Sequence, residues 1–312
     1  MMRKILLCLL MSSSLLSCAQ NNPAIPDLYK EVKFKNKNIH YRLGIQVAAC
    51  NFSLFINDVP VVRNFEEASG TFNTSAPVND LILKSGKQHF KLILYPGFKN
   101  GLPLPALAEN ILAKITVEGL KYEGEGVKTL IDPFTILEIG GEGKKFTEKG
   151  KTTAVYEGTF EAKVPYDLTA WSGSKDLRKE DPATLEKEVL AFYQQYISIV
   201  KEKDEKALAR LVYEKEKYYA QALFLGQDGS QAQWDAYLDL TRNSTLVMMP
   251  LEKYKMNFYA NGRLVTLERI DYPNIGEPAL RSESQENGRT VVGFYFCQLH
   301  KREGSNQLEL IH

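Results

Sequence analysis

The residue types that most often hold metal ions are spread thinly along this chain. Its four histidines are His40, His89, His300 and His312, and no two of them lie four residues apart. A zinc site needs several His, Cys or carboxylate ligands that converge, often from closely spaced pairs such as those of an HExxH helix. The sequence therefore predicts no metal site and no cofactor, and none of the histidines stands out as a ligand.

The glycine cluster "IGGEGKKF", residues 139–146, has the composition of a phosphate-binding loop but not its spacing. A P-loop has a glycine five residues before its Gly-Lys pair and Ser or Thr directly after it, whereas Glu138 and Lys145 occupy those places. We expect a hairpin turn here. A G-x-S-x-G nucleophile elbow is also absent from the sequence, and "DGSQ", residues 228–231, is better explained as a turn that starts a helix.

The most informative candidate for chemical modification is Cys18. An apolar run from Ile5 to Leu16 follows the basic residues Arg3 and Lys4, which is typical of an export signal. The run is shorter than the roughly 20 apolar residues that span a bilayer. Its end, Leu15-Leu16-Ser17-Cys18, resembles the lipobox of bacterial lipoproteins, with Leu three residues before the cysteine and a small residue directly before it.

This resemblance implies that residues 1–17 are removed as a signal peptide and that Cys18 is lipidated, with a diacylglycerol and a further acyl chain such as palmitate. Acyl chains on one residue hold a protein on a membrane without any spanning helix. Residues 18–27 would form a polar, Pro-broken lipidated tether. Ala19 stands where an Asp would argue for inner-membrane retention, which favours the outer membrane, on its periplasmic or surface face.

Two cysteines remain for the mature chain after Cys8 and Cys18 are set aside. Cys50 and Cys297 lie far apart in the sequence, in a compartment where disulfides persist. A disulfide needs their Cα atoms within about 4.4–6.8 Å, which two separate domains would rarely provide. We expect two buried free thiols, with an interdomain disulfide as the alternative.

Composition sets further limits on the function. The chain has 312 residues, 44% hydrophobic and 25% charged, which is ordinary for a folded protein and long enough for two domains. Removal of the predicted signal would change the formal net charge from +1 to −1. Such a chain has no global field that would attract nucleic acid, so we expect no nucleic-acid partner.

Residues 28–168 predict an antiparallel β-sandwich. Short apolar runs are broken by Asn and Gly, and "TTAVYEGTFEAKVPY", residues 152–166, alternates apolar and polar side chains as a strand with one wet face does. The segment Leu81–Tyr95 predicts a hairpin about Ser85-Gly86-Lys87. The basic segment Lys30–Asn38 predicts a solvated hairpin edge, with contact to anionic lipid head groups as the alternative.

Residues 169–181 are polar and predict a linker, after which the period changes to that of helices. The first helix has an apolar face that includes Leu185, Val189, Phe192, Tyr196, Ile199 and Val200, with Asp181 or Thr184 as its cap. "EKALARLVYEKEKYYAQALF" predicts a second helix and "SQAQWDAYLDLTRN" a third. Gly226 to Gly229 would break the chain between them.

The rest of the chain predicts strands again. Asn261-Gly262 and Asn287-Gly288 each stand between alternating runs, and Asn-Gly is the strongest two-residue hairpin signal because both positions take positive φ. A third turn is expected near Gly304. The expected architecture is therefore an all-β sandwich domain followed, over residues 182–312, by an α+β domain of three helices and a curled antiparallel meander.

This order of elements in residues 182–312 is similar to the cone-shaped family known as nuclear-transport-factor-two-like. The local match is "YQQYISIVKEKDEKALARLV", in which a long helix ends in a charged turn before the next helix opens. Enzymes of that family use acid–base residues inside the cone. The resemblance implies that a few side chains could point there, with core packing as the alternative for each: Tyr193, Tyr196, Asp235, Tyr237, Tyr259 and Tyr295.

Two classes of function remain open. The first is a lipid-anchored cell-envelope protein of non-enzymatic binding type, with a membrane contact through its anchor and a possible protein partner; one form of it is an immunity lipoprotein that neutralises a periplasmic toxin. The second is a cone-pocket hydrolase or lyase on an envelope metabolite, which requires a deep polar pocket with a carboxylate and a Tyr or His. No motif in the sequence identifies an enzyme, a ligand or a catalytic residue.

Overall fold

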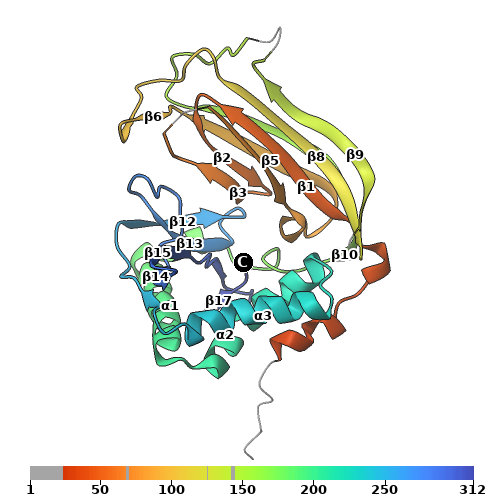
Figure 1. Cartoon of the computed structure of the whole chain (residues 1–312), viewed down its shortest axis with the longest axis vertical. Helices are drawn as coiled ribbons and strands as arrows, with labels where there is room; N and C mark the ends of the chain where they lie inside the picture. Colours follow the sequence, from red (N-terminus) through yellow and green to blue (C-terminus); the bar gives the residue numbers. More distant parts are fainter. Residues whose placement is uncertain (1–23, 68–69, 125, 142–144) are drawn as a thin grey trace, which may run out of the picture.

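The computed structural model describes residues 24–312 apart from residues 68–69, 125 and 142–144. Figure 1 shows a β-sandwich above a part built of helices and strands, with the C-terminus between the two. The predicted fold class is confirmed, because antiparallel sheets come first and three helices are then followed by antiparallel strands. The predicted signal peptide and Cys18 lie outside the described residues.

The described chain opens with two short 3-10 helices, η1 (Ile25–Lys30) and η2 (Lys35–Lys37). This overturns two expectations: residues 25–27 belong to a folded element rather than to the tether, and Lys30–Asn38 is not a hairpin. The physical reason lies in Pro26, which suits the first turn of a helix, and in Ile25 and Leu28, which are buried. Figure 1 shows this segment beside α2 and α3 before the chain rises to β1.

The sandwich consists of two four-stranded antiparallel sheets, ordered β4-β1-β8-β9 and β10-β5-β2-β3. The first sheet contains β1 (His40–Ala48), β4 (Thr71–Pro77), β8 (Leu112–Glu123) and β9 (Gly126–Ile139). The second contains β2 (Asn51–Ile56), β3 (Val59–Asn64), β5 (Lys84–Tyr95) and β10 (Ala154–Asp167). A small ribbon of β6 (Phe98–Lys99) and β7 (Leu102–Pro103) and the 3-10 turn η3 (Asn79–Leu81) complete this part.

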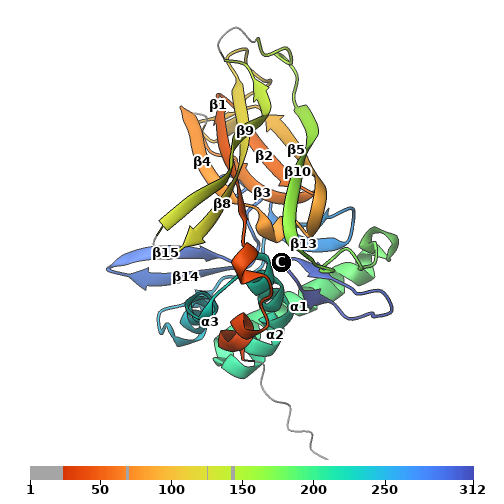
Figure 2. The same cartoon turned by 90° about the vertical axis from the view of Figure 1, so that its right-hand side faces the viewer.

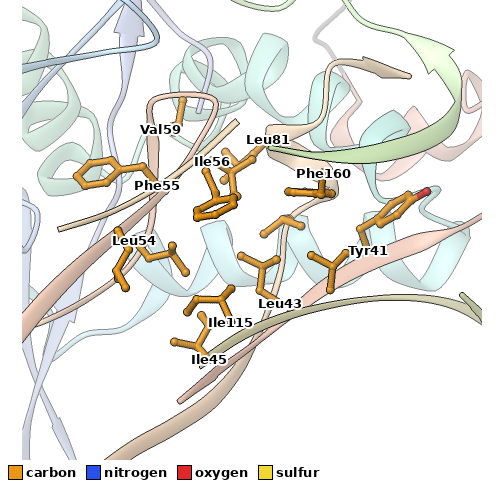
Figure 3. Packing of buried hydrophobic residues seen from close by; sticks show 14 of the residues in the cluster. Tyr41, Leu43, Ile45, Leu54, Phe55, Ile56, Val59, Leu81, Ile115 and Phe160 are labelled. Atoms are coloured by element: carbon orange, nitrogen blue, oxygen red, sulfur yellow. The ribbon is translucent and has the colours of Figure 1, made fainter. Parts of the chain in front are cut away.

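The sandwich core follows from alternation along strands such as β1 and β10 and from β2, which is buried throughout. Along β1 every second side chain is buried, and Figure 3 shows Tyr41, Leu43 and Ile45 of β1 gathered with Leu54 and other side chains of the facing sheet. On β10 the predicted inward set is largely buried, as a strand with one wet face requires. Ala154, Phe160, Ala162 and Val164 are buried, and Tyr156 is half-buried.

The predicted hairpin over Leu81–Tyr95 is wrong, because β5 runs without a turn from Lys84 to Tyr95. Gly86 has a φ of 120° and lies opposite a bulge in β10, where the pairing skips from Ala162 to Asp167 while β5 advances only from Gly86 to Lys84. The Ser85 hydroxyl bonds both the N–H and the C=O of Val164 across the bulge. The turn-forming residues Ser85 and Gly86 therefore lie at an irregularity in the pairing of β5 with β10, not at a reversal of the chain.

The described residues of the glycine cluster, 139–141 and 145–146, do not join two paired strands as a hairpin turn would. β9 ends at Ile139 and pairs with β8, while β10 begins at Ala154 and pairs with β5. The described residues between them therefore belong to a crossover from one sheet to the other. Gly140 has positive φ, and a Cβ there would lie 2.2 Å from the Ile111 carbonyl oxygen, so close backbone approach explains this glycine.

Three helices follow the linker: α1 (Pro182–Glu202), α2 (Glu205–Ala222) and α3 (Gln227–Arg242). Asp181 caps α1, since its Oδ2 accepts a hydrogen bond of 2.8 Å from the Thr184 N–H, and Asp204 caps α2 in the same way. The α1 face is buried as predicted, with Tyr193 taking a more enclosed position than Phe192. Helix α3 begins three residues earlier than predicted, so Asp228 lies in its first turn.

The final strands form two antiparallel sheets rather than one meander. One has the order β11-β14-β15 and the other β12-β13-β16-β17. Both predicted Asn-Gly hairpins are confirmed, between β12 and β13 and between β14 and β15, and Gly304 lies between β16 and β17. The bounds are β11 (Val247–Met248), β12 (Tyr254–Tyr259), β13 (Leu264–Arg269), β14 (Arg281–Glu286), β15 (Arg289–Phe294), β16 (Leu299–His300) and β17 (Glu309–Leu310). Figure 2 shows β14 and β15 projecting from the body.

The two parts share one hydrophobic core at their junction. The cluster that fills the sandwich also contains Tyr218 and Ala222 of α2, Leu264 of β13, and Ile311 near the C-terminus. Asn79 of η3 donates a hydrogen bond of 3.2 Å to the Ala222 carbonyl oxygen, which ties the sandwich to α2. Within the described part of the chain, no helix has the length and apolar character needed to cross a membrane.

Candidate functional site

The largest described cavity that joins the two parts is a cleft of about 660 Å³ at their junction, which we call the junction cleft. Its walls come from the segment after η1, from the end of β10 and the linker, from α2, and from the tail near β16 and Ile311. Because the walls belong to four segments that are far apart in sequence, only the folded chain assembles this site. Its size falls in the range of ordinary ligand pockets.

Apolar side chains and charged side chains both line the junction cleft. The apolar contribution comes from Leu28, Val32, Leu168 and Ile311 among others. Charged groups of both signs also face it, and several of them are already paired: Lys217 lies 3.1 Å from Glu31, and Arg302 lies 2.9 Å from Glu214. Such a cleft suits a ligand with an apolar body and a polar end.

Helix α2 holds the N-terminal wall of the cleft in place through Gln221. The Lys33 N–H donates to the Gln221 Oε1 at 2.9 Å, and the Gln221 Nε2 donates to the Lys33 carbonyl oxygen at 3.1 Å. This pair of bonds acts as a clamp on both backbone groups of one residue. The wall that carries Val32, Lys33 and Phe34 is therefore fixed relative to α2.

His300 lies in the cleft wall beside Ser174. The Ser174 Oγ and the His300 Nδ1 are 2.7 Å apart, and the His300 Nε2 has no hydrogen-bond partner among the described residues. Burial, helped by the charge of Arg302, lowers the pKa of His300 to about 4, so the ring is neutral near pH 7. Ser174 is itself buried and no carboxylate orients the ring, so the pair lacks the arrangement of an activated serine nucleophile.

The six side chains named by the cone resemblance do not all converge on one site, although Tyr196 lies within electrostatic range of Tyr295 and Tyr237. Tyr193 is enclosed, its hydroxyl donating to the Cys297 carbonyl oxygen and accepting from the Leu267 N–H, both at 3.0 Å. Its pKa is raised well above the usual value by burial. Tyr196 is also buried, whereas Tyr295 is half-buried and its hydroxyl lies 2.5 Å from the Ser282 Oγ.

Of the other three candidates, Asp235 and Tyr259 lie apart from these, whereas Tyr237 is close enough to Tyr196 to interact with it electrostatically. Asp235 is exposed on α3 and accepts a bond from Gln231 at 2.8 Å. Tyr237 donates to the buried Glu216 Oε1 at 2.7 Å, and Tyr259 belongs to the junction rather than to the helical layer. The space between the helices and β13 is filled by apolar side chains: Leu185, Val189, Leu208, Val212, Val265, Leu267, Leu299 and Leu310. This filling gives the cone-pocket enzyme hypothesis no support.

Sequence reasoning missed a buried ion pair that joins the two parts. The Arg63 Nη1 on β3 lies 3.0 Å from the Glu268 Oε1 on β13 and also donates 2.5 Å to the Gly276 carbonyl oxygen. Tyr259 and Asn257 donate to the other carboxylate oxygen, and the Arg63 Nη2 donates to the Tyr259 hydroxyl. Burial opposes the charge on Arg63, but Glu268 and Tyr259 outweigh it and raise its pKa.

A cavity of about 220 Å³ adjoins this ion pair, with Phe55, Phe65 and Tyr95 in its wall. Arg63 and Glu268 already bond each other and their neighbours, so we assign the cluster a structural role as a latch between the sandwich and the second part. The available sequence signal was a charged residue in each of two largely apolar strands, Arg63 in "VPVVRN" and Glu268, followed by Arg269, in "LVTLER". Nothing in the sequence indicated that Arg63 and Glu268 meet.

Sequence reasoning also missed Glu216, the buried partner of Tyr237. It lies on α2 and its pKa is raised, chiefly by burial. A further tie at the junction joins Asp80 to His312, with 3.0 Å between the Oδ2 and the Nε2, and Tyr219 donates to the same carboxylate at 3.2 Å.

Within the described residues, no group of three or more His, Cys, Asp or Glu side chains is arranged to hold a metal ion. Cys50 and Cys297 are buried free thiols, so the interdomain disulfide that stood as the alternative does not form. Burial raises the pKa of each thiol to about 12. Neither cysteine is therefore a ready nucleophile or metal ligand at neutral pH.

Fold and cleft together define a two-part protein, a β-sandwich joined to an α+β unit, with a ligand-sized cavity where the parts meet. No protein-family model, curated protein or solved structure matches this chain. Its function must therefore be argued from its own residues.

Proposed function

We propose that this protein is a lipid-anchored cell-envelope protein of non-enzymatic binding type, and that the junction cleft holds its ligand. The observation that carries the cleft assignment is a cavity of about 660 Å³ whose walls combine apolar side chains with charged groups of both signs. The lipid anchor is supported by the lipobox-like end of the apolar run at Cys18. Its preferred location is the outer membrane.

A binding role fits the chemistry of the cleft better than a catalytic role does. His300 and its neighbour Ser174 are both buried, the His300 Nε2 has no carboxylate partner among the described residues, and the nearby charges form ion pairs with one another. An acid–base catalyst needs a titrating group within reach of the substrate. The expected ligand is an amphipathic molecule whose apolar part contacts Leu28, Leu168 and Ile311.

The anchor is tested by Cys18→Ala in the full precursor. We expect uncleaved precursor without added lipid mass, whereas the unaltered chain should appear as a mature, acylated form by mass spectrometry. Normal mature protein from the variant would overturn the lipoprotein assignment.

The cleft is tested by native mass spectrometry of protein purified gently from its own membranes. Thr169 is exposed in the cleft wall, so Thr169→Trp should block the cleft and remove a co-purified small molecule. Thr152→Trp is the matched control, because Thr152 is also an exposed threonine but lies outside the cleft. Equal occupancy in both variants would place the ligand elsewhere.

A second candidate function, binding of a protein such as an incoming toxin, is favoured by strand β9. This strand lies at the edge of its sheet, and Val127, Leu130 and Phe134 along it are exposed. Exposed edge strands can pair with another chain, although Pro133 within β9 lacks the N–H that such pairing uses. A stoichiometric protein partner that survives moderate salt and is lost in Leu130→Lys would support this candidate over the cleft.

A further inference from the structure

We propose that residues 33–37, which we call the KFKNK segment, bind the surface of an anionic membrane directly. This contact would be distinct from the acyl anchor and would orient the protein on the bilayer. The observations are the charge of the segment, one exposed aromatic side chain and the place of the segment in the chain.

The charge of the KFKNK segment is not compensated. Lys33, Lys35 and Lys37 are exposed, and among the described residues none of them has a carboxylate partner. The two acidic residues nearest in sequence are already engaged, Asp27 with Lys30 at 2.6 Å and Glu31 with Lys217 at 3.1 Å.

The bond that Lys35 does make leaves its charge in place. Its Nζ donates to the carbonyl oxygen of Tyr29 at 2.6 Å, which is a neutral acceptor. Three cations within five residues therefore remain, and an anionic lipid surface attracts each of them. This holds although the mature chain as a whole is close to neutral.

Phe34 adds an apolar group in the middle of these cations. Its side chain is 43% exposed, and its backbone is left-handed, with φ 60° and ψ 28°. A bulky residue is strained in this conformation, so the fold holds Phe34 there against its own preference. The clamp of Gln221 on Lys33 supplies that constraint from the preceding residue. An aromatic ring flanked by lysines is typical of protein segments that lie in the membrane interface.

The position of the segment brings it to the bilayer, and this step rests on the proposed lipid anchor. Ala24, the first described residue, follows Cys18 by six residues, and six residues span at most about 20 Å. The N-terminal end of the fold, which contains η1 and the KFKNK segment, is thus the part held nearest to the membrane. A short tether keeps the local lipid concentration high, so a weak direct contact is enough to orient the protein.

The orientation of the protein on the bilayer also determines where the junction cleft opens. Lys33 and Phe34 also line the junction cleft, so binding of the segment to the bilayer brings the mouth of the cleft to the membrane surface. An amphipathic ligand would then reach the cleft from the membrane without crossing the aqueous space.

The test uses the mature chain, residues 18–312, with Cys18→Ser so that no acyl chain contributes. Sedimentation is measured with vesicles of phosphatidylcholine alone and with an equal mixture of phosphatidylcholine and phosphatidylglycerol. We expect binding to the mixed vesicles only, at about 0.1 M salt, with at least a fivefold loss at about 1 M salt, because the screening length falls from about 10 to about 3 Å. Equal sedimentation with both vesicles would overturn the proposal.

Charge reversal locates the contact. The triple variant Lys33→Glu, Lys35→Glu and Lys37→Glu should lower the bound fraction at least fivefold. A matched triple reversal of lysines exposed on the sandwich changes the net charge equally and should leave most of the binding; it uses Lys99, Lys128 and Lys163. If both triples lose binding alike, the attraction is not local to the segment and the proposal fails.

Phe34→Gly separates a loss of contact from a loss of fold. Glycine accepts a φ of 60° without strain, so the thermal midpoint should be unchanged or higher while vesicle binding falls. Undiminished binding by this variant would refute the role given to the ring. These vesicle measurements involve no lipidation, so their failure is distinguishable from failure of the anchor, which the Cys18→Ala precursor tests on its own.

Discussion

Removal of the guanidinium at position 63 should destabilise the protein far more than loss of an exposed ion pair. The Arg63 side chain is 11% exposed and that of Glu268 is 8% exposed, so Arg63→Ala leaves a buried carboxylate without its cation. Breaking a buried pair in this way costs about 3–5 kcal/mol, roughly a hundred- to several-thousandfold in the folded-to-unfolded ratio.

The matched control is Arg242→Ala. Arg242 also bonds a glutamate, Glu205, through two nitrogens, at 2.8 and 3.1 Å, but the two side chains are 60% and 38% exposed. Surface pairs of this kind contribute about 0–1 kcal/mol. The assay is urea unfolding at neutral pH, followed by circular dichroism and by tryptophan fluorescence, to which Trp171, buried beside the junction, contributes together with Trp234.

A double-mutant cycle identifies the cause of the loss. Glu268→Gln keeps an oxygen that can accept from Tyr259 but removes the charge, so adding it to Arg63→Ala should restore part of the lost stability. The reasoning is refuted if Arg63→Ala costs no more than Arg242→Ala. It is also refuted if the free energy of unfolding lost in the double variant equals the sum of the losses in the two single variants.

Three further predictions concern single groups. Burial raises the pKa of Glu216 in the folded state. The protonated Glu216 carboxyl therefore contributes fully to stability below the pKa it has in the unfolded chain, and this contribution is lost as the pH rises through its pKa in the folded protein. The thermal midpoint of Glu216→Gln, taken relative to that of the unaltered protein at the same pH, should therefore be higher at pH 7 than at pH 4. The opposite trend would contradict this. Asp181→Ala removes the cap bond to Thr184 and should cost about 1 kcal/mol in urea unfolding, whereas no change would contradict the cap. Cys50 and Cys297 should react with a thiol reagent only after unfolding, and rapid reaction of the native protein would contradict their burial.

Local signals in the sequence were sufficient for much of the fold. The Asn287-Gly288 pair forms the expected two-residue hairpin, with φ of 51° and 75°, because few other residues accept both conformations. The Asp181 cap followed by Pro182 likewise starts α1 where expected. The same kind of signal failed at Gly86, since a glycine with positive φ can lie opposite a bulge as well as in a turn.

The candidate sites could not be predicted, because they depend on contacts between distant segments. Arg63 and Glu268 meet across 205 positions of sequence, and each one alone is simply a charge in an apolar strand. The junction cleft needs the chain before β1, the end of β10, α2 and the tail at once. Periodicity predicts elements and their buried faces, but it does not predict which edges of two parts come together.

A ligand bound in the junction cleft should raise the stability of the folded protein, so unfolding measurements should detect whether the cleft is occupied. Tyr218 and Ile311 belong to the shared core and also line the cleft, so a ligand there binds a surface that exists only while the two parts remain joined. Such a ligand stabilises the folded state by about 2.7 kcal/mol when its concentration is a hundred times its dissociation constant. Breaking the Arg63 latch loosens the same junction from its other side, so Arg63→Ala should weaken ligand binding although Arg63 does not line the cleft. The free energy of unfolding and the ligand affinity should thus both depend on the junction between the sandwich and the second part.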